Sequence, residues 1–137
     1  MATAASTPTK IDLYRELARQ LRADAIRCST AAGSGHPTSS LSAADLMAVL
    51  LLSHLRYDWT LPTLPAHDPL LFSQAHASPL SYSLARAAGV IDDADLPPFR
   101  QMGTRLQAPP TPSPPCVAPP PVPPAPALPP PLRLPRA

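Results

Sequence analysis

Two histidines, His36 and His76, are the residues of this chain whose types and neighbours could do chemistry. His36 lies in a Ser-Gly-His-Pro turn and His76 in a Ser-Gln-Ala-His-Ala segment, and each precedes an apolar helical pattern. The free N–H groups and the dipole at a helix start favour anionic groups. A neutral imidazole there can donate to a phosphate or sugar oxygen, while Gly35 lets the backbone approach a ligand and Pro37 stiffens the turn. The two segments therefore predict an anion-binding site.

The other possible metal or redox ligands are isolated in the sequence. His54 follows an apolar run and His67 lies in a proline-rich connection, which is typical of turn residues. No two histidines are three or four residues apart, so a zinc site has no support. Cys28 and Cys116 form no Cys-x-x-Cys motif, which favours a reducing cytosol over a disulfide framework. The sequence predicts no metal site.

Composition excludes several classes of partner. The 137 residues allow one domain, and the formal net charge is +2. Lys10 is the single lysine and the arginines are scattered, so we expect no nucleic-acid partner. Residues 1–8 lack the charged and apolar regions of a signal peptide, and Leu46–Leu52 is too short to cross a bilayer. These features predict a cytoplasmic protein with no membrane partner.

The elements that must position the two histidines can be read from the hydrophobic pattern. A helix of about five turns is expected from Thr9 to a left-handed cap at Gly33. Its opposite face carries most of the charged residues. The residues predicted to form its buried face are Ile11, Tyr14, Leu17, Leu21, Ala25 and Ile26.

A second helix is expected after a loop that spans residues 34–41. Ser42 and Asp45 have the spacing of a capping box, and the helix that follows, Ala43–Leu52, is apolar on nearly every side. Such a helix is typical of one buried inside a larger body. Further along, Leu70–Ser73 predicts a buried strand and His76–Ala88 a helix. Asp92 is expected to cap a last short helix.

The fold class that follows is α/β, seen as a mostly helical N-terminal fragment. One strand cannot make a sheet, so residues 9–107 are expected to be part of an α/β domain. Residues 1–8 are expected to be disordered. Of 23 prolines, fifteen lie in residues 108–137, which predicts a disordered or polyproline-II tail.

The motifs around both histidines resemble the N-terminal part of transketolase. This thiamine diphosphate-dependent enzyme of the pentose phosphate pathway moves two-carbon ketol units between sugar phosphates. The resemblance covers about residues 11–106, in order and without clear gaps. The matching segments are Ser34–Leu50, Leu55–Asp58, Ala77–Leu80, Ala88–Ile91 and Phe99-Arg100.

The resemblance implies a role for each histidine. His36 corresponds to the family histidine that faces the sugar substrate, and His76 to the one that contacts the cofactor's diphosphate. It also implies thiamine diphosphate and Mg²⁺ as cofactors, a sugar-phosphate substrate and a homodimer. The family's metal-binding Gly-Asp-Gly segment and its activating glutamate do not occur within these 137 residues, so we expect a fragment that is inactive alone.

The chain also departs from the family pattern. Gln74 and Ala75 stand where the family has Lys and Gly before the second histidine. The segment 108–110, Ala-Pro-Pro, replaces a further Gly-His-Pro turn, and the tail after it keeps only an approximate register. We interpret the tail as a degraded copy of family sequence, from pseudogene decay or base-reading errors. A selected proline-rich segment is the rival explanation.

A second functional class remains open on the sequence. Pro-x-x-Pro pairs in the tail could make the chain a helical interaction module that docks on SH3 or WW domains. The expected basic anchor is out of register, because Arg133 would need proline at the position of Leu128. A pull-down with such domains would distinguish the two classes.

Overall fold

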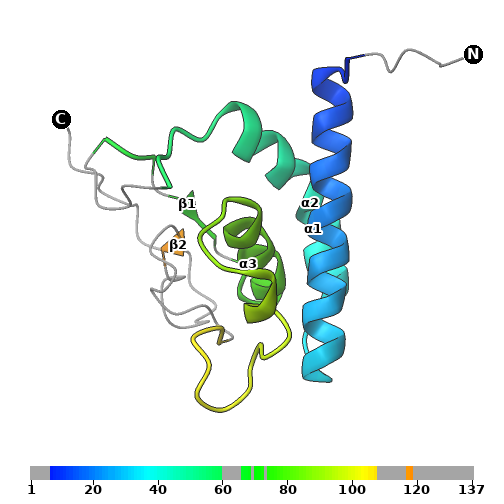
Figure 1. The fold of residues 1–137 in the computed structure, drawn as a ribbon, viewed down its shortest axis with the longest axis vertical. Coiled ribbons are helices and arrows are strands. Elements are labelled where there is room, and N and C mark those ends of the chain that lie inside the picture. Colours follow the sequence, from blue (N-terminus) through cyan, green and yellow to red (C-terminus); the bar gives the residue numbers. More distant parts are fainter. Residues whose placement is uncertain (1–6, 60–65, 69, 73, 108–116, 119–137) are drawn as a thin grey trace, which may run out of the picture.

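The structure is a computed structural model that describes residues 7–59, 66–68, 70–72, 74–107 and 117–118. It is mostly helical, as predicted, and the long helix α1 packs against both α2 and α3 (Figure 1). A pair of two-residue strands lies on the side of α3 away from α1 (Figure 1). The elements are α1 (Lys10–Ala32), α2 (Pro37–Ser53), β1 (Leu70–Leu71), the 3₁₀ turn η1 (Ala75–Ala77), α3 (Ser78–Ala87), the 3₁₀ turn η2 (Asp93–Asp95) and β2 (Val117–Ala118).

Both ends of α1 are where the sequence predicts them. Thr9 is the N-cap, and the Asp12 backbone N–H donates to its hydroxyl at 3.2 Å while the Thr9 N–H donates to the Asp12 carboxylate at 3.0 Å. This reciprocal capping box satisfies two N–H groups that the helix itself cannot. Gly33 ends the helix with φ 59°, the left-handed cap that glycine adopts at little cost.

The buried face of α1 differs from the prediction. Leu21 and Ala25 are buried as expected, but the side chains of Ile11 and Ile26 are 57% and 46% exposed. The buried stripe instead runs through small residues and a carboxylate, because α2 and α3 both pack closely on this helix. Its members are Ala18, Leu21, Asp24, Ala25, Cys28 and Ser29.

The prediction of where α2 begins is wrong by six residues, because Ala43 was expected to be the first helical residue. The helix starts at Pro37, whose fixed φ suits the first helical position, and His36 is its N-cap. Ser42 does not cap a helix; its hydroxyl donates to the Ser39 carbonyl at 2.9 Å inside α2. The expected loop over residues 34–41 is therefore only the short turn that joins α1 to α2.

The apolar helix α2, which the sequence predicts to be buried inside a larger body, is buried on one side and exposed on the other in this chain. Ala44, Met47 and Ala48 are buried, whereas the side chains of Leu46 and Leu52 are 69% and 48% exposed.

Among the residues that the structure describes, none of the helices combines the length and the hydrophobicity that a membrane span requires.

The strand predicted at residues 70–73 is confirmed at Leu70 and Leu71. These residues pair in parallel with Val117 and Ala118, in the register Leu70 to Val117 and Leu71 to Ala118. The prediction that residues 108–137 lack regular structure is wrong at these two positions, which lie between prolines and supply β2. The rest of the tail, with its Pro-x-x-Pro pairs, and residues 1–6 lie outside the described residues.

The core is formed between the three helices and the segment that follows α3. The larger buried side chains are Leu21, Met47, Phe72, Leu80, Tyr82, Leu84, Ile91, Leu96, Phe99 and Leu106.

Cys28 is also part of this core. Burial raises the pKa of its thiol to about 12, with a smaller contribution from Asp24, which is typical of a structural rather than a reactive cysteine.

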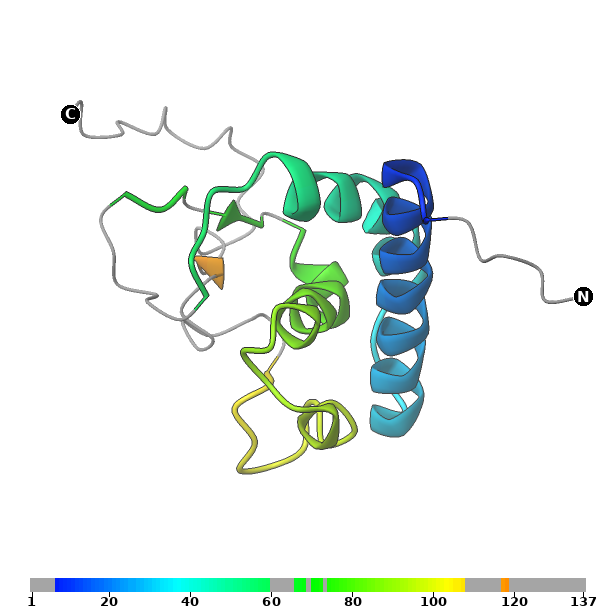
Figure 2. The same cartoon turned by 45° about the horizontal axis from the view of Figure 1, so that its top comes forward.

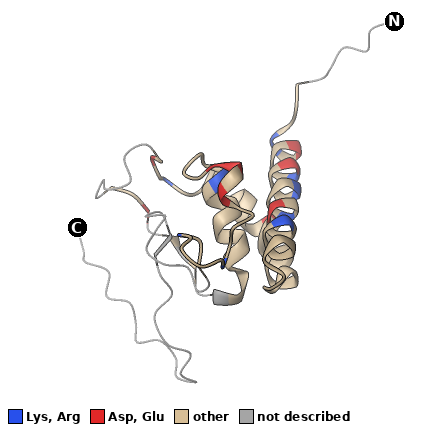
Figure 3. Cartoon of the chain, turned by 60° about the horizontal axis from the view of Figure 1, so that its bottom comes forward, with Lys and Arg blue, Asp and Glu red and all other residues tan. Residues whose placement is uncertain are grey.

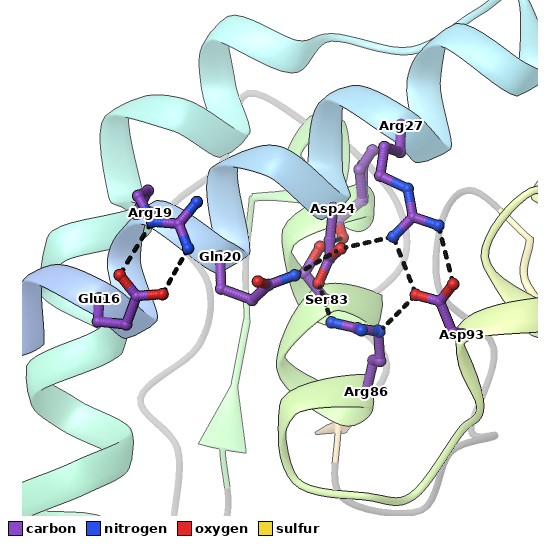
Figure 4. Close-up of polar contacts among 9 residues, drawn as sticks. Glu16, Arg19, Gln20, Asp24, Arg27, Ser83, Arg86 and Asp93 are labelled. Carbon is purple, nitrogen blue, oxygen red and sulfur yellow. Dashed lines mark hydrogen bonds and ion pairs between the residues drawn. The ribbon is translucent and has the colours of Figure 1, made fainter. Parts of the chain in front are cut away.

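A network of charges joins α1, α3 and η2 around a buried carboxylate. The Asp24 side chain is fully buried and accepts from Arg86 Nη1 at 2.7 Å, Gln20 Nε2 at 3.0 Å and Arg27 Nη1 at 3.2 Å (Figure 4). Arg27 and Arg86 also donate to Asp93, at 2.9 and 2.8 Å. Charged residues of both signs lie along α1 and on the neighbouring turns (Figure 3), and η2 lies beside the C-terminal end of α1 (Figure 2). We call these four residues, Asp24, Arg27, Arg86 and Asp93, the charge network.

The charge network predicts a loss of stability in acid. Hydrogen bonds from Arg27, and the charges of both arginines, lower the pKa of Asp93 from its ordinary value of 3.8 to about 2. Because the folded-state pKa is depressed, the stabilisation is complete above the unfolded pKa and is lost as the pH falls through about 2. Free energies of unfolding measured between pH 5 and 2 should fall less steeply for Asp93→Asn than for the parent chain. Parallel curves for the two chains would contradict this prediction.

Candidate functional site

The turn between α1 and α2 places His36 at the start of α2. Ser34 N–H donates to the Ser29 carbonyl at 3.2 Å, which closes the end of α1. Gly35 follows with φ 123°, and His36 caps α2 without using its side chain for capping. The imidazole therefore remains available to a ligand.

Gly35 is favoured both by its backbone conformation and by a close contact within the protein. The sequence predicts a close approach at this glycine, but to a ligand. Its φ lies where L residues are rarely found, as the expected close backbone approach suggests. The close neighbour, however, belongs to the protein: a Cβ at this position would lie 3.1 Å from Ser29 Oγ and 4.0 Å from Phe99 Cε1. The turn is thus packed against the end of α1 and against Phe99.

Gly35→Ala should destabilise the chain by about 2–3 kcal/mol, because it adds backbone strain to a tight contact. Gly89→Ala is the matched control, since Gly89 has φ 75° and no atom within 4 Å of an added Cβ. That control should cost only about 1–2 kcal/mol of left-handed strain. Urea unfolding followed by circular dichroism measures both values. Equal costs would show that the contact with Ser29 is unimportant.

The structure brings the two predicted site residues together. The ring centroids of His36 and His76 are 4.5 Å apart, with an angle of 51° between the ring planes. His36 comes from the start of α2 and His76 from η1, directly before α3, and both residues are exposed. Forty residues of sequence separate them, so this contact depends on the packing of η1 against α2. We call His36 and His76 the histidine pair.

The other two histidines lie apart from this arrangement. His54 is the exposed C-cap at the opposite end of α2. The ring of His67 packs on Tyr57 with centroids 4.2 Å apart, and its Nε2 accepts from the Asp58 backbone N–H at 3.1 Å. His67 therefore has a local structural role, in agreement with its interpretation as a turn residue.

Arg100 is a neighbour of the turn that reasoning about single residues did not identify. Its Nη1 donates to Ser34 Oγ at 3.3 Å, two residues before His36. The adjacent Phe99 is fully buried, with its ring 5.8 Å from that of Tyr82. The only signal in the sequence was the Phe-Arg pair among the segments that resemble the family.

Two buried hydroxyl groups lie in the first turns of the helices that follow the histidines. Ser40 in α2 and Ser81 in α3 are almost completely buried, and neither hydroxyl has a hydrogen-bond partner among the described residues. Buried hydroxyl groups are usually satisfied by protein, water or a ligand. The first turns of α2 and α3 therefore each contain a hydroxyl group that can still form a hydrogen bond.

The donors at this site suit an anion better than a metal ion. Imidazole and guanidinium N–H groups donate to phosphate oxygens, and the histidine pair is open to solvent. The described residues contain no group of three or more His, Cys, Asp or Glu side chains that could hold a metal ion. The donor set of this arrangement is thus of the kind that suits a phosphate-bearing ligand.

Comparisons with known proteins match most of this chain. The family model described as transketolase, thiamine diphosphate binding domain, matches residues 13–115. Similar proteins include transketolase-like protein 2 of Bos taurus, 40% identical over 104 residues, and transketolase of Mus musculus, 39% identical over 103 residues. These matches cover 76% and 75% of this chain but only 17% and 16% of the relatives. Transketolase of Rhodobacter capsulatus is 33% identical over 111 residues, which are 80% of this chain and 16% of that protein.

Proposed function

This chain belongs to the transketolase family, and from that premise we propose that it supplies the first part of a thiamine diphosphate site. The observation that carries the proposal is the contact of His36 with His76, 4.5 Å between ring centroids. Two imidazoles from separate helix starts converge on one exposed place, which suits a cofactor diphosphate that lies beside a sugar-phosphate substrate. The family match covers both histidines.

In the proposed division of roles, His76 donates a hydrogen bond to the diphosphate of the cofactor. Its place directly before α3 adds the partial positive charge of that helix start. His36 faces the sugar-phosphate substrate and orients its oxygens from the start of α2. When bound, thiamine diphosphate supplies the chemistry that cleaves and forms a carbon–carbon bond beside a carbonyl. The two histidines bind and orient the reactants for that chemistry.

We further propose that these residues do not carry out ketol transfer alone. The chain spans about one sixth of the length of the relatives that it matches. It has no Gly-Asp-Gly segment for a divalent ion, so the protein ligands of Mg²⁺ and the activating glutamate would have to come from other polypeptide segments. We therefore propose the sugar-phosphate substrate and the homodimer for the complete enzyme and not for this chain alone.

A graft tests this function directly. Residues 9–107 replace the corresponding segment of mouse transketolase, and ketol transfer is measured with and without thiamine diphosphate and Mg²⁺. The grafted enzyme should be active and cofactor-dependent, whereas the 137-residue chain should not turn over. An inactive but folded graft would contradict the proposed site. Steady, metal-dependent turnover by the chain alone would contradict the need for other segments.

A further inference from the structure

Arg100 adopts a backbone conformation that needs an explanation. Its φ is 60°, and it is the one non-glycine residue with positive φ among those that the structure describes. Left-handed backbone is unfavourable for a residue with a Cβ, so it persists where the surroundings fix it, and it is frequent at functional sites. Gly103, three residues later, also has a positive φ, but as a glycine it does so without strain.

Contacts on both sides fix the backbone at Arg100. Phe99 is fully buried, and its ring lies behind Gly35 and near Tyr82. The Arg100 backbone N–H donates to the Leu106 carbonyl at 2.8 Å, which closes the loop that follows. The backbone is therefore held at one place beside the turn between α1 and α2.

The side chain of Arg100 is directed to that turn and not to a carboxylate. Its Nη1 donates to Ser34 Oγ at 3.3 Å. Other arginines of the chain pair with acidic residues, for example Arg22 with Asp45 and Arg56 with Asp68. Among the described residues, no ion pair joins Arg100 to a carboxylate. Its guanidinium can thus donate to the turn between α1 and α2, which carries His36.

We propose that Arg100 is a positioning residue of the histidine pair. Phe99 lies next to Gly35, and Arg100 donates a hydrogen bond to Ser34. The segment after α3 therefore contacts two successive residues of the turn between α1 and α2. Fixing Ser34 and Gly35 fixes the origin of the His36 side chain, and with it the contact of that ring with His76. The catalytic meaning of this contact rests on the proposed function, but the contact itself does not.

The test observes the histidine pair in the 137-residue chain without cofactor. The four histidines of the chain are labelled with ¹³C and ¹⁵N. The ring signals of His36 and His76 are assigned by their loss in His36→Gln and His76→Gln. The readout is the nuclear Overhauser effect between the carbon-bound ring protons of His36 and His76. The signals of His54 and His67 report whether the rest of the fold is intact.

Arg100→Gly is the decisive variant, because glycine relieves the backbone strain while it removes the guanidinium. The signal between the two rings should disappear in Arg100→Gly and in Ser34→Ala, and the double variant should show no additional change. Arg100→Lys should restore part of the signal. Arg19→Ala, which removes an arginine paired with Glu16 on the exposed face of α1, should leave it unchanged.

Each outcome decides the proposal. An undiminished signal in Arg100→Gly and Ser34→Ala would overturn the positioning role. Loss in Arg100→Ala but not in Arg100→Gly would overturn it as well, since the backbone rather than the guanidinium would then be responsible. Because the measurement needs no thiamine diphosphate, it remains valid if the graft proves inactive, so the two proposals fail separately.

Discussion

His76→Ala in the grafted enzyme should weaken thiamine diphosphate binding by roughly 1–3 kcal/mol, the range expected for the loss of one charge-assisted hydrogen bond. That loss corresponds to an increase in Kd of about five-fold to more than a hundred-fold. The reason is the place of His76 in η1, where its exposed ring lies directly before the N-terminus of α3. The measurement is the cofactor concentration needed for half-maximal activity, together with direct calorimetric titration.

His36→Ala provides the comparison within the same site. It should lower sugar-phosphate turnover while the affinity for the cofactor changes little, because His36 is assigned to the substrate side of the histidine pair. His54→Ala, at the far end of α2, is a control that should change neither quantity. Equal effects of His36→Ala and His76→Ala on cofactor affinity would show that the two roles are misassigned.

Asp24→Ala should lower the free energy of unfolding of the 137-residue chain by about 3 kcal/mol, as expected when one partner of a buried ion pair is removed. Asp24 is fully buried and accepts from Arg86, Arg27 and Gln20. Its removal leaves the partly buried Arg86, 26% exposed, with Asp93 as its one acidic partner among the residues that the structure describes. It also removes the direct ion pair between α1 and α3. Urea unfolding followed by circular dichroism measures the change.

Asp45→Ala is the matched control for this substitution. Asp45 pairs with Arg22 between α1 and α2, but its side chain is 71% exposed. Exposed ion pairs contribute about 0–1 kcal/mol, so this variant should be nearly as stable as the parent chain. If Asp24→Ala cost no more than Asp45→Ala, the charge network would have no structural role.

The sequence could predict elements whose ends carry local signals. Thr9 and Gly33 mark α1 because capping depends on residues within one turn of the helix end. The start of α2 was misplaced because Ser42 and Asp45 have the spacing of a capping box, while the actual signal was Pro37 at the first helical position. Local patterns can compete, and packing of α2 on α1 decides between them.

Features that depend on distant partners could not be predicted. The burial of Asp24 requires Arg86, which lies 62 residues further along the chain. The same limit applies to the pairing of Leu70 with Val117 and to the exposure of Ile11, because each depends on how helices and strands meet. Helix starts and the family resemblance predict His36 and His76 as site residues, and the structure shows that their rings lie in contact. The hydrogen bond from Arg100 to Ser34 was not predicted.

The parallel pairing of β1 with β2 has a consequence for how the site could be completed. Parallel strands end at the same edge of their sheet, and ligands of open α/β sheets bind beyond the carboxyl ends of the strands. β1 ends at Leu71, and His76 follows five residues later through η1. Any parallel strand added beside this pair would therefore also end at the edge from which the chain leads to His76. The two short strands thus set the polarity of a larger sheet and determine which of its edges would gather the remaining ligand-binding loops.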